Sequence, residues 1–188
     1  MSQITRSWLS FAAIGSGIVH LALVISSPLF FGIPLLALGL VELAWAVTVL
    51  VSGRLVMARA AQLGATTPLI LWSLLVVVAT VLGAPEIASP LRFLPMAIAA
   101  VFELFIAAIL SVQIRRTRDS ADGLADAAAA APRTASAGRY LAAVFVGGLL
   151  VGALTTPALA ATQAGTVALE HGGTMGGMMM MDMPGMGH

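Results

Sequence analysis

Long apolar runs make up most of this chain, and five of them are long enough to cross a bilayer. They cover about residues 8–26, 34–54, 68–84, 93–114 and 140–161. Crossing the hydrocarbon layer takes about 20 apolar residues at about 1.5 Å each, and every backbone amide within it must be bonded inside its own segment. The sequence therefore predicts an all-α integral membrane protein with about five transmembrane helices.

The composition supports this class and excludes several functions. Hydrophobic residues make up 60% and charged residues 9% of the 188 positions, whereas soluble domains have about 25% charged residues. The net charge is only +1 and there is no lysine, so nucleic acid is not expected as a partner. The absence of cysteine excludes disulfides and thiol chemistry. No catalytic motif is recognisable, and we expect a protein that is not an enzyme.

The second and fourth runs resemble each other. Residues 34–54 read PLLALGLVELAWAVTVLVSGR and residues 95–115 read PMAIAAVFELFIAAILSVQIR, so that Glu42 aligns with Glu103 at an offset of 61 positions (103 − 42). This weak internal repeat predicts a tandem duplication of a two-helix hairpin, whose second helix carries the acid. A fifth, C-terminal helix and a disordered tail follow.

The predicted organisation has four parts. Residues 1–116 form a four-helix transmembrane unit, 117–138 a cytoplasmic alanine-rich linker, 139–161 the fifth transmembrane helix and 162–188 an extracytoplasmic tail. Arginines flanking membrane helices stay on the cytoplasmic side. Eight of the nine fall on one side of this arrangement and only Arg92 on the other. We therefore expect a bacterial inner-membrane protein with its N-terminus inside and its tail outside.

The tail is rich in soft metal ligands. Thioether sulfur suits Cu(I), imidazole binds copper in general, and the neighbouring glycines let the chain wrap around an ion. The candidate ligands are His171, Met175, Met178, Met179, Met180, Met181, Met183, Met186 and His188. Copper, as Cu(I), is the predicted cofactor. Alternatively, the tail is only disordered, or protects by being oxidised to sulfoxide. Residues 158–160 also resemble a signal-peptidase site, and cleavage after Ala160 would release the tail.

Two acids and one histidine lie within the apolar runs. Glu42 and Glu103 stand near the middle of their helices, where an ionised group costs roughly 3 kcal/mol or more. Brought together by the repeat, they would bind a cation or relay protons; otherwise each is hydrogen-bonded or protonated and only fixes helix packing. His20 lies at a similar depth on the first helix, so a contact with Glu42 is expected, either as part of this site or as a satisfied polar contact.

Small residues mark two further contact surfaces. Gly15, Ser16 and Gly17 on the first helix permit close approach of a neighbouring helix. Gly148 and Gly152 have the spacing used by paired membrane helices, which permits a homo-oligomer.

Copper binding, delivery or homeostasis is the function that the sequence favours, with the lipid bilayer as environment and a copper-handling or other membrane protein as partner. A non-enzymatic scaffold or accessory subunit is the first alternative, because polar residues in membrane helices also lock helices together. A small proton-coupled transporter that uses Glu42 and Glu103 is the second.

Overall fold

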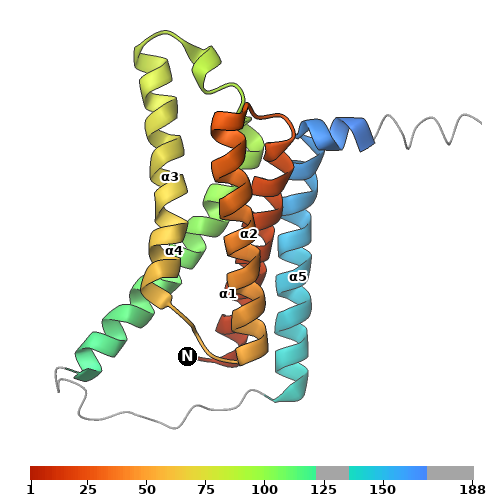
Figure 1. The fold of residues 1–188 in the computed structure, drawn as a ribbon. Coiled ribbons are helices and arrows are strands. Elements are labelled where there is room, and N and C mark those ends of the chain that lie inside the picture. Colours follow the sequence, from red (N-terminus) through yellow and green to blue (C-terminus); the bar gives the residue numbers. More distant parts are fainter. Residues whose placement is uncertain (122–135, 169–188) are drawn as a thin grey trace, which may run out of the picture.

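The computed structural model describes residues 1–121 and 136–168, which are helical apart from short turns (Figure 1). The helices are α1 (Gln3–Val24), α2 (Leu29–Ser52), α3 (Ala58–Val81), α4 (Phe93–Ala121) and α5 (Ala137–Ala160), with one 3-10 turn, η1 (Pro85–Ile87). All five α-helices are long and apolar enough to cross a membrane. The predicted all-α membrane fold is confirmed.

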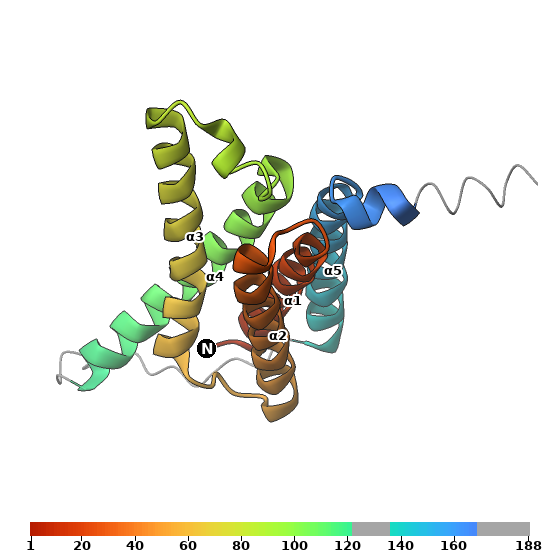
Figure 2. The ribbon, with the colours of Figure 1, turned by 45° about the horizontal axis from the view of Figure 1, so that its top comes forward.

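Helix α1 is the centre of the bundle and packs against α2, α4 and α5 (Figures 1 and 2). In its most apolar stretch 61% of the residues are buried, compared with 11% in α3. Small residues make this possible, because Ala12, Gly15, Ser16 and Gly17 all face neighbouring helices and are buried. A helix with such a surface accepts neighbours on several sides at once.

The closest approach joins α1 to α2. A β-carbon added to Gly39 would lie 2.8 Å from the carbonyl oxygen of Gly17, and one added to Gly17 would lie 3.0 Å from the carbonyl oxygen of Gly39. The two backbones are therefore in direct contact, which only glycine permits at both positions. The small-residue surface predicted on the first helix is confirmed.

Helix α5 packs on the opposite side of α1. Gly147 lies against the Trp8 ring, and Trp8 Nε1 donates a hydrogen bond of 2.9 Å to the carbonyl oxygen of Ala143. In contrast, a β-carbon added to Gly148 or Gly152 would meet no described atom within 4 Å. Their surface is available for another helix, and a homo-oligomer through them stays a prediction.

Helix α3 begins ten residues earlier than the sequence analysis expected. The third crossing was predicted to start at Pro68, but the helix starts at Ala58 and Pro68 lies inside it. Proline in a membrane helix is tolerated when neighbouring groups compensate for the lost hydrogen bond. Its ring approaches the carbonyl of the residue four positions earlier, which is Gly64.

Helix α4 also exceeds its predicted bounds, because it continues past Ile114 to Ala121. Residues 115–121 contain neither glycine nor proline, and arginine is a good helix former. Arg118 in the last turn also complements the negative end of the helix dipole. The predicted linker at 117–138 is thus partly helical at both ends, and residues 122–135 lie outside the described part of the chain.

The two predicted hairpins are present as packed pairs, α1 with α2 and α3 with α4. Gln62 Nε2 on α3 donates a hydrogen bond of 2.7 Å to Ser111 Oγ on α4. The pairs have different surroundings, since α4 also packs on α1 whereas α2 barely contacts α3. Their origin by duplication stays a prediction.

The start of the predicted tail is ordered into a short helix at 163–168 (Figure 1). Thr162 caps it by accepting a hydrogen bond of 3.2 Å from the Gly165 amide, and its own hydroxyl donates to the Leu159 carbonyl. The sulfur and imidazole ligands predicted in the tail, from His171 to His188, lie outside the described residues.

Candidate functional site: a histidine between two glutamates

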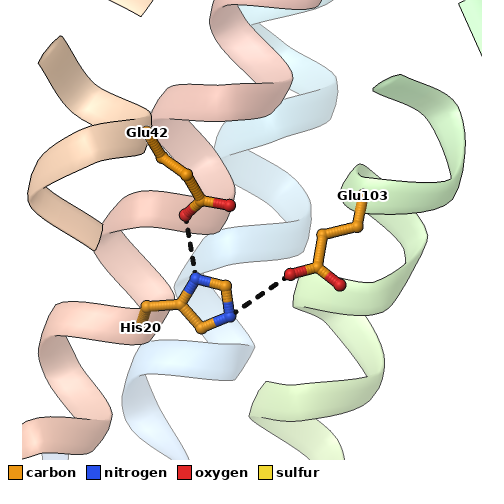
Figure 3. A group of neighbouring side chains, drawn as sticks. All are labelled: His20, Glu42 and Glu103. Atoms are coloured by element: carbon orange, nitrogen blue, oxygen red, sulfur yellow. Dashed lines mark hydrogen bonds and ion pairs between the residues drawn. The ribbon is translucent and has the colours of Figure 1, made fainter. Parts of the chain in front are cut away.

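Three ionisable side chains from three helices meet inside the bundle (Figure 3). They are His20 on α1, Glu42 on α2 and Glu103 on α4, and we call them the His–Glu–Glu cluster. Their side chains are 0%, 10% and 1% exposed, respectively. One nitrogen and two oxygens of the cluster all lie within 4.8 Å of one another. The cluster is therefore compact as well as buried.

His20 stands between the two acids and faces each with a different nitrogen. Its Nδ1 atom is 2.8 Å from Glu42 Oε2, a hydrogen-bond distance, and its Nε2 atom is 3.5 Å from Glu103 Oε1. The second carboxylate oxygen of Glu42 accepts a hydrogen bond of 3.2 Å from Ser16 Oγ. Glu42 is thus held by two donors on α1, whereas Glu103 approaches the ring from the other side.

The packing of α1 on α2 explains why His20 and Glu42 meet. The contacting glycines, Gly17 and Gly39, each precede a cluster residue by three positions and so lie on the same helix face. In α-helices side chains lean toward the N-terminus of their own helix, and in two antiparallel helices they lean in opposite directions. His20 and Glu42 therefore reach toward each other along the crossing.

Two atoms of the cluster lack hydrogen-bond partners. His20 Nε2 and Glu103 Oε1 are buried and, among the described residues, neither makes a hydrogen bond; they lie at ion-pair distance without hydrogen-bond geometry. A buried, ionised carboxylate without a compensating charge costs roughly several kcal/mol. Glu103 therefore requires a proton of its own, a protonated His20 as its ion-pair partner, or a bound cation.

The gap between these two atoms fits a shared metal ion. Nitrogen and oxygen ligands of a tetrahedral ion lie about 2.0–2.2 Å from the metal, which places them about 3.4 Å apart. The observed separation of His20 Nε2 and Glu103 Oε1 is 3.5 Å. Glu42 would then act through the other ring nitrogen, fixing the tautomer of His20 as carboxylates do around metal-bound histidines.

No family model, curated protein or solved structure matches this chain.

The cluster borders an apolar cavity of about 340 Å³ between α2 and α3. Among the residues that the structure describes, Glu42 is the one ionisable residue in its wall, beside Trp45, Thr48 and small residues of α3 such as Gly64. A second cavity, of about 250 Å³, lies farther along the same seam and shares Leu38 with the first. The cluster is thus reached through Glu42, while His20 and Glu103 lie behind it.

All three cluster residues could be predicted from the sequence, but their arrangement only in part. The predicted contact of His20 with Glu42 is confirmed at 2.8 Å. The two acids, which were predicted to pair with each other, are separated by the His20 ring. Ser16 was singled out only as a small residue, although its position four residues before His20 puts both on one helix face. That spacing was the available signal for its polar role.

Proposed function

We propose that this protein binds a metal cation inside the membrane and takes part in copper binding, delivery or homeostasis. The observation that carries the proposal is the facing pair His20 Nε2 and Glu103 Oε1, which lie 3.5 Å apart and, among the described residues, make no hydrogen bond. A bound cation would complete the coordination of both and neutralise the buried carboxylate. Imidazole and carboxylate ligands suit Zn(II) and Cu(II). The 3.5 Å separation is that of a tetrahedral site, and a square-planar Cu(II) ion would draw the two atoms to about 2.8 Å.

Glu42 has a supporting role in this proposal. Its hydrogen bond with Nδ1 holds the ring so that the lone pair of Nε2 faces Glu103. Removing such a partner typically lowers metal affinity about 10- to 100-fold without abolishing binding. Ser16 in turn orients the Glu42 carboxylate.

The tail would supply a second metal-binding site with softer ligands. Its methionines and histidines, His171 to His188, suit Cu(I) and would capture copper at the membrane surface. We place the tail outside and the N-terminus inside an inner bacterial membrane, on the bias of the arginines. A reporter fused after His188 tests this, and a cytosolic signal would remove the tail from any extracytoplasmic role.

Metal analysis of four purified proteins tests the copper proposal. They are the full chain, a chain ending at Ala168, the Glu103→Gln variant and the shortened chain with Glu103→Gln. After loading with Cu(II) and gel filtration, the shortened chain should keep about one copper, and its spectrum should show imidazole coordination. The shortened Glu103→Gln chain should lose that copper. Equal copper in both shortened chains would contradict the assignment of the cluster.

Proton-coupled transport is a second candidate, favoured by one specific observation. Glu42, His20 and Glu103 form a continuous row, with Glu42 on the cavity wall and Glu103 fully buried. A histidine can accept a proton on one nitrogen while donating from the other. In proteoliposomes with an internal pH dye, Glu42→Gln and Glu103→Gln should each abolish proton movement. Unchanged flux in both would eliminate this candidate.

If the substitutions change neither copper content nor proton flux, we infer that the protein is a scaffold or accessory subunit. In that case neither copper content nor proton flux depends on the cluster, and a co-purifying membrane protein identifies the partner. The cluster would then only join α1, α2 and α4.

A further inference from the structure

The α2/α3 cavity has the properties of a ligand site in its own right. Its volume of about 340 Å³ falls in the range of small-molecule sites, about 300–1,000 Å³. Its wall is apolar apart from Glu42 and the hydroxyl of Thr48. Sites of this kind bind an apolar body and fix it by a few polar groups.

Glu42 is the group that determines which ligand fits. Its side chain is 10% exposed, in contrast to the fully buried Glu103, and no arginine of the described part of the chain lines the cavity. Ser16 and His20 each bond one of its oxygens, which leaves further lone pairs, since a carboxylate accepts about four hydrogen bonds. A negative group in an apolar cavity attracts a positive ligand far more strongly than in water.

Trp45 adds a second element of recognition. Its ring lines the same cavity as Glu42, and its Nε1 atom is bonded to the Val56 carbonyl at 2.8 Å, which fixes the ring. Indole faces bind organic cations through the ring quadrupole, most strongly where water is excluded.

We propose that the α2/α3 cavity binds a small lipophilic organic cation, such as an aromatic ammonium compound, whose charge lies between Glu42 and Trp45. The few contacts between α2 and α3 leave the seam open along the bundle, so a ligand dissolved in the membrane reaches it. This function is separate from copper binding, which uses the far side of His20.

Benzyltrimethylammonium is a suitable probe because its charge is permanent. Its uncharged carbon isostere, neopentylbenzene, has nearly the same shape and controls for partition into the apolar cavity. Binding is measured by equilibrium dialysis of the purified full chain in detergent micelles, with protein-free micelles subtracted. Glu42→Gln should weaken binding of the cation about tenfold or more, as expected for a desolvated cation contact. The same substitution should leave the binding of neopentylbenzene unchanged.

A second variant keeps the carboxylate and fills the cavity. Gly64 lines the cavity, and a β-carbon added there meets nothing within 4 Å, so Gly64→Leu projects into free space. It should weaken cation binding about tenfold or more. Gly148→Leu, at an equally open position on α5, is the matched control and should bind normally. The two variants should have the same helical content and unfolding midpoint, because each replaces a helical glycine by leucine.

The outcomes separate this proposal from the copper proposal. In the chain ending at Ala168, Glu103→Gln should lose copper and keep the cation, whereas Gly64→Leu should lose the cation and keep copper. Equal binding of the cation and its isostere would mean that the cavity holds any apolar chain, lipid included, and would overturn the proposal. Normal cation binding by both Glu42→Gln and Gly64→Leu would overturn it as well.

Discussion

Replacing Gly39 with alanine should loosen the crossing of α1 and α2 by about 1–3 kcal/mol, because overpacked contacts cost that amount. The added β-carbon would lie 2.8 Å from both the Gly17 carbonyl oxygen and Leu21 Cγ, whereas ordinary contacts begin at 3.4 Å. The helices must therefore separate by about 0.6 Å (3.4 − 2.8). A gap of this size removes a quarter to a half of the dispersion energy of each atom pair across the crossing.

The perturbation should also reach the His–Glu–Glu cluster. Gly39 lies three residues before Glu42, and Gly17 three residues before His20. Separation of the two backbones lengthens the 2.8 Å contact between His20 Nδ1 and Glu42 Oε2. Because this contact orients the ring, affinity for copper should fall about tenfold or more. Packing and ion binding should thus change together.

Unfolding in mixed micelles with increasing dodecyl sulfate measures the effect on stability. Gly148→Ala is the matched control, because it makes the same chemical change at a position with open space. Alanine favours a helix over glycine by about 1 kcal/mol in water, and the control measures that contribution in the membrane. Gly39→Ala should unfold at a lower dodecyl sulfate fraction than the control. If both variants unfold together, the backbone contact at Gly39 is not what joins α1 to α2.

Two hydrogen bonds between helices give further tests. Trp8→Phe removes the hydrogen bond to the Ala143 carbonyl. It should lower the free energy of unfolding by about 0.6 kcal/mol, the average measured for hydrogen bonds between membrane helices. An unchanged free energy of unfolding would show that ring packing alone holds α5 against α1. Gln62→Ala and Ser111→Ala, singly and together, should show a coupling energy of about 0.5–2 kcal/mol by the same unfolding assay. Strict additivity would show that this bond does not join α3 to α4.

The helices could be predicted because lipid leaves a chain few options. An apolar run of sufficient length must satisfy its own amides, and this requirement fixes α1 to α5 without knowledge of their packing. Their ends are not fixed by this requirement, because alanine and arginine are good helix formers and let a helix continue beyond its apolar run. For this reason α3 begins at Ala58 rather than Pro68, and α4 extends to Ala121.

The sequence predicts which residues belong to the His–Glu–Glu cluster but not how they are arranged. An acid within a membrane helix is costly, which singles out Glu42 and Glu103 from the sequence. Which of them contacts His20, and through which atom, depends on how α2 and α4 are rotated around α1. That rotation follows from contacts between residues far apart in sequence, such as Gly15 with the Phe102 ring. No local pattern encodes such a contact.

Whether the cluster serves packing or ion binding can be decided by comparing its two acids. Glu42 has two donors, Ser16 Oγ and His20 Nδ1, and Glu42→Leu would leave both unpaired at about 1–3 kcal/mol each. Glu103 Oε1 makes no hydrogen bond within the described part of the chain, so Glu103→Leu removes an unsatisfied buried group and should be neutral or stabilising.

A residue that only joined helices would behave in the opposite way, since its loss would weaken the bundle. The dodecyl sulfate assay on the metal-free protein distinguishes the two cases, with Glu42→Leu as the internal comparison. If Glu103→Leu destabilises as much as Glu42→Leu, Glu103 is a structural contact and the metal site loses one of its two ligands. If the metal-free variant is at least as stable as the native protein while copper binding is lost, Glu103 is retained at a cost to stability because it binds the ion.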